Sequence, residues 1–127
     1  MTDAELNQKE IENIKETIMD CYHEGHVKAD PKLYEEVLHD SWKFFMFDES
    51  ENLKIVDKKE YYSWYDPENV NTSLKWNTEF YYVDIFEKNA QVKLKIETQE
   101  FSYLDYFNLM KIGGKWWIVH KLSQKIK

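Results

Sequence analysis

The fold is decided by residues 105–121, which read DYFNLMKIGGKWWIVHK. Aromatic and aliphatic side chains make up much of this stretch, as they do in buried strands. The consecutive Gly113 and Gly114 supply the positive φ angles that a two-residue hairpin requires. The stretch therefore predicts two long antiparallel strands, residues 101–112 and 115–125, joined by a tight turn.

More strands precede this hairpin. Residues 92–96 alternate apolar and charged side chains, which indicates a strand with one buried face and one wet face. Residues 76–85 show the same period of two. Strict alternation in that strand predicts one face with Trp76, Thr78, Phe80 and Tyr82 and an opposite face with Tyr81, Val83 and Ile85. Two shorter strands are expected earlier, over residues 42–47 and 53–56.

The first part of the chain has helical periodicity. Residues 4–24 carry apolar side chains at three-to-four spacing from Leu6 to Tyr22, which predicts an amphipathic helix. Gly25 follows this stripe and is the expected end of the helix.

Two shorter helices are also expected. Asp30 and Pro31 have the character of an N-cap and a first helical residue. The run from Asp57 to Glu60 has the form of a capping box and predicts a third helix that continues to Tyr65.

The order of these elements predicts an α+β fold. Helices gathered on one face of an antiparallel sheet give two-layer packing. If the sheet is strongly curved, it and the first helix form a cone with an internal pocket, which suits a small molecule. At 127 residues the chain has the length of a single domain, so we expect one unit over residues 1–127.

Composition narrows the class of partner. The net charge of −7 at pH 7 argues against binding to the nucleic-acid backbone. All 17 basic residues are lysine, which removes the bidentate fork that arginine offers to anions and mildly disfavours an anionic substrate. No apolar run has membrane-spanning length. A single cysteine, Cys21, fits a reducing compartment, so the expected location is the cytoplasm.

Two stretches carry a resemblance to a known superfamily. One is YHEGHVKAD over residues 22–30, followed by Leu33 and by residues 38–40; the other is the closing hairpin. Over about residues 8–125 the chain resembles the nuclear-transport-factor-2-like (cystatin-like cone) superfamily, and its hairpin is similar to the "putative lumazine-binding" and SnoaL-like branch. The resemblance implies the cone fold. The superfamily includes isomerases, cyclases, dehydratases and non-catalytic modules, so it does not settle function.

The ketosteroid isomerases of this superfamily suggest specific positions. In that enzyme a tyrosine and a protonated aspartic acid stabilise an oxyanion beside an aspartate base. The resemblance implies Tyr22 and Asp105 at the two donor positions. It also puts Met46 where the general base is expected, which argues against isomerase activity.

Asp105 is also unusual without the resemblance. It shares strand parity with the apolar side chains of Phe101, Tyr103, Phe107 and Leu109. A carboxylate on such a face must pair, meet trapped water or keep its proton. Tyr22 lies on the inner stripe of the first helix. The two residues are therefore interpreted either as a pair that stabilises the core or as polar groups that face a ligand.

Other polar residues are less specific. Asp48 is a candidate for a shifted catalytic base, although its surroundings read as a solvated turn. His23 and His26 are three residues apart on a helix, but no further ligand at a clear spacing completes a metal site, so no metal and no cofactor are expected. His39 and His120 read as a helix end and an exposed strand position.

The leading prediction is a protein that binds a small apolar or aromatic molecule in its cone. Tyr22 and Asp105 are the expected polar contacts, and the expected walls are Phe44, Trp64, Trp76 and Phe107. One alternative is a cofactor-free isomerase, cyclase or dehydratase in which Asp48 or a histidine replaces the base. Another is a dimerisation or scaffold module whose own aromatic side chains fill the cone. A homodimer through the outer face of the sheet is also expected.

Overall fold

The computed structural model describes residues 1–126 and shows an α+β fold. The helical segments are α1 (Asp3–Thr17), the π-helix η1 (Ile18–His23), α2 (Glu24–Lys28), α3 (Pro31–Glu35), α4 (Lys58–Ser63) and the 3₁₀ turn η2 (Pro67–Asn69). The strands are β1 (Leu38–Phe47), β2 (Leu53–Asp57), β3 (Asn77–Phe86), β4 (Asn89–Glu97), β5 (Ser102–Ile112) and β6 (Lys115–Lys125). The predicted fold class is confirmed.

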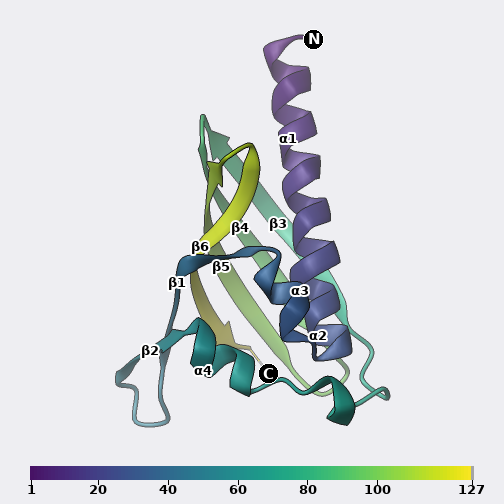
Figure 1. Cartoon of the computed structure of the whole chain (residues 1–127), viewed down its shortest axis with the longest axis vertical. Helices are drawn as coiled ribbons and strands as arrows, with labels where there is room; N and C mark the ends of the chain where they lie inside the picture. Colours follow the sequence, from purple (N-terminus) through teal and green to yellow (C-terminus); the bar gives the residue numbers. More distant parts are fainter. Residues whose placement is uncertain (127) are drawn as a thin grey trace.

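The six strands form one open sheet in the order β2-β1-β6-β5-β4-β3. Only the β1–β6 pairing is parallel, and the others are antiparallel. The helices lie on one side of the curved sheet, with α1 running along it (Figure 1). Within the described residues no helix is both long and apolar enough to cross a membrane.

The first helix departs from its predicted limits at both ends. Its N-terminal turns extend past the ends of the strands (Figure 1), so Leu6 is 48% exposed rather than part of the inner face. The helix also does not end at Gly25. It continues through η1 and α2 to Ala29, whose φ of 49° is the left-handed conformation of a helix C-cap.

Gly25 has a packing role instead. A Cβ atom at this position would lie 2.4 Å from Cε1 of Tyr34, on the neighbouring helix α3. The absence of a side chain therefore lets the Tyr34 ring pack directly on the α2 backbone. A glycine that allows this contact has the same sequence signature as a helix stop, which explains the wrong prediction.

The caps of the short helices agree with the prediction in part. The Asp30 carboxylate accepts a hydrogen bond from the Lys32 N–H at 3.0 Å, and Asp57 caps α4 through the Glu60 N–H at 2.9 Å. The Glu60 carboxylate pairs with Lys54 at 2.9 Å rather than completing a capping box. The α4 helix ends at Ser63, two residues before the predicted end at Tyr65.

Strand alternation is interrupted by a bulge in β3. Phe80 pairs with Leu94 and Tyr82 pairs with Lys93, so β3 has one extra residue between these two pairs. After the bulge the inner face is occupied by Val83 and Ile85, whereas Tyr82 is 40% exposed. The prediction that Phe80 and Tyr82 share a face is therefore wrong.

A second bulge lies in β6 at Val119. Asn108 of β5 pairs with His120 and the adjacent Leu109 pairs with Ile118, which leaves Val119 unmatched. Strict alternation from Trp116 and Ile118 would bring His120 and Leu122 to the inner face. Because of the bulge, Lys121 is buried there instead, and Leu122 is 45% exposed.

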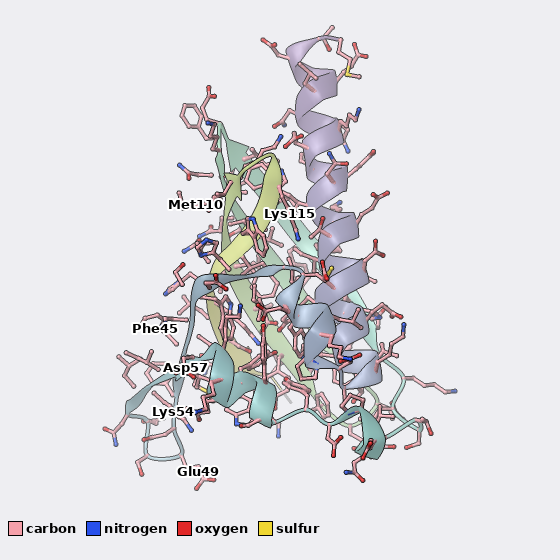
Figure 2. The ribbon with its side chains drawn as sticks, in the orientation of Figure 1. Phe45, Glu49, Lys54, Asp57, Met110 and Lys115 are labelled. Carbon is pink, nitrogen blue, oxygen red and sulfur yellow. The ribbon has the colours of Figure 1, made fainter. Side chains whose placement is uncertain are left out.

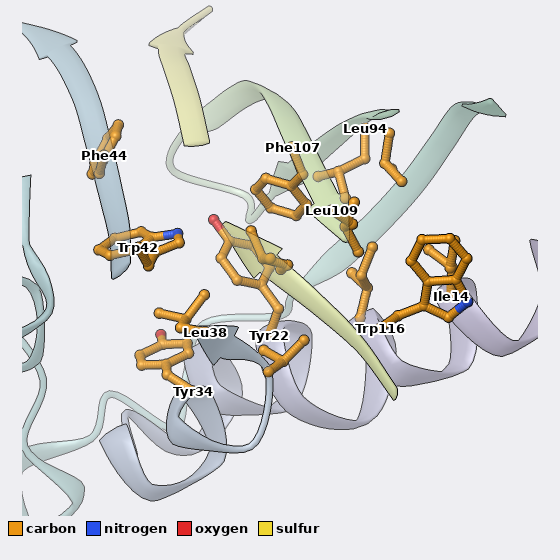
Figure 3. Packing of buried hydrophobic residues seen from close by; sticks show 14 of the residues in the cluster. Ile14, Tyr22, Tyr34, Leu38, Trp42, Phe44, Leu94, Phe107, Leu109 and Trp116 are labelled. Atoms are coloured by element: carbon orange, nitrogen blue, oxygen red, sulfur yellow. The ribbon is translucent and has the colours of Figure 1, made fainter. Parts of the chain in front are cut away.

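The core lies between the helices and the inner face of the sheet (Figure 3). Ile14, Ile18 and Tyr22 from the helical segment pack against Phe107 and Leu109 of β5 and their neighbours. The β5–β6 hairpin has φ angles of 61° at Gly113 and 78° at Gly114, as the sequence predicts for a two-residue turn. In Figure 2 the side chains of Phe45 and Met110 point away from the helices, on the outer face of the sheet.

Candidate functional site

A cavity of about 340 Å³ lies at the wide end of the cone, between the end of the long helix, α4 and the inner face of the sheet. Its wall is mostly aromatic, with rings from Tyr22, Phe44, Tyr61, Trp64, Tyr65, Trp76, Phe101 and Tyr103. The remaining lining residues are Met46, Ile96, His26, Asp105, Lys121 and Ser123. Such an apolar cavity with a few polar groups suits one small organic molecule.

Tyr22 and Asp105 meet in this wall. The Tyr22 hydroxyl donates to Oδ2 of Asp105 at 2.8 Å, and each residue is 1% exposed. Tyr22 belongs to the π-helical turn η1, and such local widening of a helix is frequent at functional sites. Burial and the nearby Asp105 charge raise the pKa of Tyr22 well above its usual range, so the hydroxyl remains a donor.

The second oxygen of Asp105 is not satisfied. Oδ1 is buried and has no hydrogen-bond partner among the described residues. Leaving a buried acceptor unpaired costs about 1–3 kcal/mol, and more when the group is charged. A ligand donor at this oxygen would therefore recover free energy that the folded chain alone does not gain.

Lys121 brings an amine into the same cavity. Its side chain is 4% exposed, and Nζ donates to the Tyr61 hydroxyl at 3.3 Å. Nζ also lies 4.3 Å from the ring centroid of Phe44, 4.8 Å from that of Tyr61 and 5.1 Å from that of Tyr22. Within residues 1–126 no carboxylate oxygen lies within 4.0 Å of this nitrogen.

Opposing effects act on the protonation of the Lys121 amine. Burial lowers the pKa of Lys121, and the negative charge of Asp105 partly offsets this. The three ring faces also favour the ammonium form. Among the described residues the buried amine therefore has a single hydrogen-bond partner and unused donor capacity.

His26 is neutral and its tautomer follows from its contacts. Nδ1 lies 2.8 Å from the backbone carbonyl oxygen of Tyr22, which can only accept, so Nδ1 carries the proton. Nε2 is then an acceptor, with the hydroxyls of Tyr61 and Tyr65 both at 3.4 Å. Burial lowers the pKa of His26 to about 3, with a smaller contribution from the positive charge of Lys121.

Most of the residues predicted as the site lie together. Phe44, Trp64 and Trp76 line the cavity with Tyr22 and Asp105. Phe107 does not line it. This ring is fully buried in the core and meets the Tyr22 ring edge-on at a centroid distance of 4.8 Å.

The structure also shows where the two residues considered at the general-base position lie. Met46 lines the cavity, so a thioether occupies the wall where the isomerase resemblance implies a carboxylate. Asp48 lies in the exposed β1–β2 turn, where Oδ1 accepts from the N–H groups of Ser50 and Asn52 at 2.8 and 2.9 Å. It is outside the cavity.

The other histidines lie elsewhere. His23 contacts the Thr78 hydroxyl at 2.8 Å, His39 contacts Ser41 at 2.8 Å, and His120 lies 3.5 Å from the Asn108 amide on the outer face. Across residues 1–126 no three His, Cys, Asp or Glu side chains are arranged to hold a metal ion.

Sequence reasoning missed Lys121, His26, Tyr61 and Tyr65 as cavity residues. Lys121 is hidden by the β6 bulge, which strict alternation cannot anticipate. Tyr61 and Tyr65 are four residues apart in the helix predicted from Asp57 to Tyr65, so the sequence does place them on one helix face. His26 follows Gly25, the predicted end of the helix, so the helical pattern does not assign it to the inner face.

The curved open sheet with the long helix packed on it is the nuclear-transport-factor-2-like cone fold. The chain belongs to the family described as "Putative lumazine-binding", whose model matches residues 9–124. No curated protein matches the sequence.

Solved structures agree on the fold. An NTF2-like protein of unknown function from Shewanella baltica is 22% identical, with a TM-score of 0.82 over 100% of this chain and 98% of that one. Another from Methylobacillus flagellatus is 21% identical, with a TM-score of 0.79 over 94% of each chain. A domain of unknown function with a cystatin-like fold from Nostoc punctiforme is 14% identical, with a TM-score of 0.68 over 100% of this chain and 80% of that one.

Proposed function

We propose that this protein binds a flat, partly aromatic small molecule in the cone cavity. One observation carries the proposal: Asp105 and Lys121 line the aromatic wall, and among the described residues Oδ1 of Asp105 has no hydrogen-bond partner and the Lys121 amine has one. Such groups are costly to bury unless a bound molecule completes their hydrogen bonds.

The chemistry of the wall narrows the ligand class. Asp105 Oδ1 accepts from a ligand N–H or O–H, while Lys121 Nζ donates to a ligand carbonyl or ring nitrogen. The rings of Trp64, Trp76 and Phe44 pack against the flat faces. A bicyclic heterocycle with N–H and C=O groups side by side on one edge fits these demands, and lumazine, which the family description names, is such a molecule.

The cavity supports binding over the two alternatives. A scaffold module whose own side chains fill the cone would leave no space of about 340 Å³. An isomerase of the related type needs a base, and the wall has Met46 in that place while Asp48 lies outside. His26, with a pKa lowered to about 3, is a poor base near neutral pH.

Binding is tested by titrating the protein with lumazine and with a naphthyl alcohol, following tryptophan fluorescence and the heat of binding. Asp105→Asn should weaken the binding of lumazine about tenfold or more, as expected for a lost hydrogen bond to a charged group, and Tyr22→Phe should weaken it by removing the hydroxyl that orients the Asp105 carboxylate. Asp48→Asn is the matched control and should leave the affinity unchanged. Failure of both probes to bind, or unchanged affinity in Asp105→Asn, would remove this cavity from the function.

We also propose that two copies associate through the outer face of the sheet. Phe45, Leu104, Tyr106 and Leu122 line an apolar groove there, and Phe47 and Leu53 at its edge are 61% and 63% exposed. Apolar surface of this kind marks interaction sites. Sedimentation should give a dimer that Leu122→Glu converts to a monomer, and a wild-type monomer at high concentration would contradict the proposal.

We also propose that residues 1–127 form one functional unit and that the protein is located in the cytoplasm. The free thiol of Cys21 supports a reducing compartment. Fractionation of cells that express the chain with a terminal tag tests the location, and recovery outside the cytoplasm would overturn it.

A further inference from the structure

The Lys121 amine can act as a nucleophile as well as a hydrogen-bond donor. A primary amine in an apolar pocket is a nucleophile whenever it is neutral, and buried lysines serve in this way in Schiff-base enzymes. Lys121 is 4% exposed and lines the cavity, and Tyr61 is its single hydrogen-bond acceptor among the described residues. No other lysine of the described chain is buried.

We propose that Lys121 forms a reversible imine with an aldehyde or ketone carried by a flat, apolar molecule in the cavity. The inference rests on the proposed binding function, because the carbonyl compound must occupy the same space between the aromatic rings. It adds a covalent chemistry and a substrate class, namely carbonyl compounds, to that cavity.

The reaction balances without a further reagent. The neutral amine of Lys121 attacks the carbonyl carbon, a C–N bond forms, and one amine proton moves to the carbonyl oxygen to give a carbinolamine. The hydroxyl then takes a proton from solvent water, the C–O bond breaks, and water leaves as the C=N bond forms. The proton returns from the iminium nitrogen to its donor, so the net change is amine plus carbonyl to imine plus water.

Tyr61 positions the amine for this attack. Its hydroxyl oxygen accepts a hydrogen bond from Lys121 Nζ at 3.3 Å. On its other side the hydroxyl lies 3.4 Å from Nε2 of His26, which the Nδ1 contact to Tyr22 leaves as an acceptor. This arrangement orients the Tyr61 oxygen lone pairs toward the amine.

The surroundings also suit the iminium intermediate. Its positive charge lies on the Lys121 nitrogen, so the ring faces of Phe44, Tyr61 and Tyr22 stabilise it as they would stabilise the ammonium. The Asp105 carboxylate adds a favourable charge. Separately, burial lowers the pKa of Lys121, which raises the share of neutral amine near neutral pH.

The test is reductive trapping with naphthaldehyde and cyanoborohydride, followed by intact-protein mass measurement and peptide mapping. A single adduct is expected, heavier by the mass of the aldehyde less one oxygen atom, located on Lys121. It should form at least about tenfold faster than adducts on exposed lysines. Mapping the wild-type protein needs no variant, so the test does not depend on a mutant that folds.

Variants sharpen the result. Lys121→Arg keeps the cation but cannot form an imine, so it should lose the fast adduct, whereas Lys43→Met on the exposed face of β1 should retain it. Labelling spread evenly over surface lysines, or a fast adduct that persists in Lys121→Arg, would overturn the imine. If the naphthyl alcohol binds but the aldehyde gives no adduct on Lys121, the imine is wrong and the proposed binding stands. If the alcohol does not bind and Lys121 is still labelled, the proposed binding is wrong and the reactive amine stands.

Discussion

Lys121 and Phe44 are direct partners across the parallel pairing of β6 with β1, and Lys121 Nζ lies 4.3 Å from the centroid of the Phe44 ring. Both side chains are buried, at 4% and 5% exposure, so the contact is shielded from water. An ammonium over a ring face is worth about 2 kcal/mol when desolvated and about 0.5–1 kcal/mol at an exposed site.

This contact predicts a measurable coupling. A double-mutant cycle with Phe44→Leu and Lys121→Met should give a coupling free energy of about 1–2 kcal/mol in urea unfolding. The control is the half-buried pair of Lys115 and Trp117, with Nζ 4.2 Å from the ring centroid and the Lys115 side chain 43% exposed, for which about 0.5 kcal/mol is expected. Equal coupling in both pairs would show that burial does not strengthen the Lys121 contact.

The hydrogen bond between Tyr22 and Asp105 predicts a stability difference between two tyrosines. Tyr22→Phe leaves the buried carboxylate without its partner and should lower the free energy of unfolding by about 2–3 kcal/mol. Tyr82→Phe removes an exposed hydrogen bond of the same 2.8 Å length, to Gln91, and should cost less than about 0.5 kcal/mol. Urea unfolding at neutral pH measures both, and similar losses would contradict the assigned role of Asp105.

The close approach of Gly25 to Tyr34 predicts the sign of a helix substitution. Alanine normally stabilises a helix interior by about 1 kcal/mol relative to glycine. At Gly25 the added Cβ would lie 2.4 Å from the Tyr34 ring, so Gly25→Ala should instead destabilise the protein by about 1–3 kcal/mol. Thermal unfolding measures this loss, and Tyr34→Leu in the same chain should remove part of it. A stabilised single variant would show that the ring moves freely.

His26 predicts a loss of stability in acid. Its pKa is about 3 in the folded protein and near 6.5 in the unfolded chain, so the unfolded chain binds the extra proton between these values. Stability should therefore fall as the pH drops from 6.5 toward 3, by on the order of 3 kcal/mol at pH 4. His23, whose pKa burial also lowers, contributes in the same direction.

Urea unfolding of His26→Gln over this pH range checks the assignment. The variant should lose most of the pH dependence, whereas His120→Gln, altered on the outer face, should retain it. The titratable groups that face His26 are Tyr22, Tyr34, Tyr61, Tyr65 and Lys121; burial raises the pKa of the tyrosines away from this range and lowers the pKa of Lys121. An unchanged slope in His26→Gln would assign the acid sensitivity to other groups.

The sequence predicts the parts of this molecule that depend on local chemistry. The Gly113-Gly114 turn, the Asp30 and Asp57 caps and the buried side chains of β4 all follow from short patterns. Asp105 stands out in the sequence because a carboxylate on an apolar strand face must be paired, hydrated or protonated. These features need no knowledge of distant contacts.

What the sequence could not predict depends on long-range packing. Gly25 lies inside a helix, where the absence of a side chain leaves space for the Tyr34 ring of another helix. Tyr82 and Lys121 change face because each follows a bulge, and a bulge is set by the pairing of two strands rather than by either one. Phe107 has the correct parity for the cavity but lies deeper, against Tyr22.

The unmatched Val119 has a consequence for which side chains line this pocket. Deleting Val119 would leave Lys121 in the cavity, because without the bulged residue strict alternation from Ile118 puts His120 outside and Lys121 inside. Regular pairing of Val119 with β5 would instead turn Lys121 out and bring Leu122 in, with no residue of the chain changed. Which side chains line this cavity therefore depends on how β5 and β6 pair, and not only on which residues β6 contains.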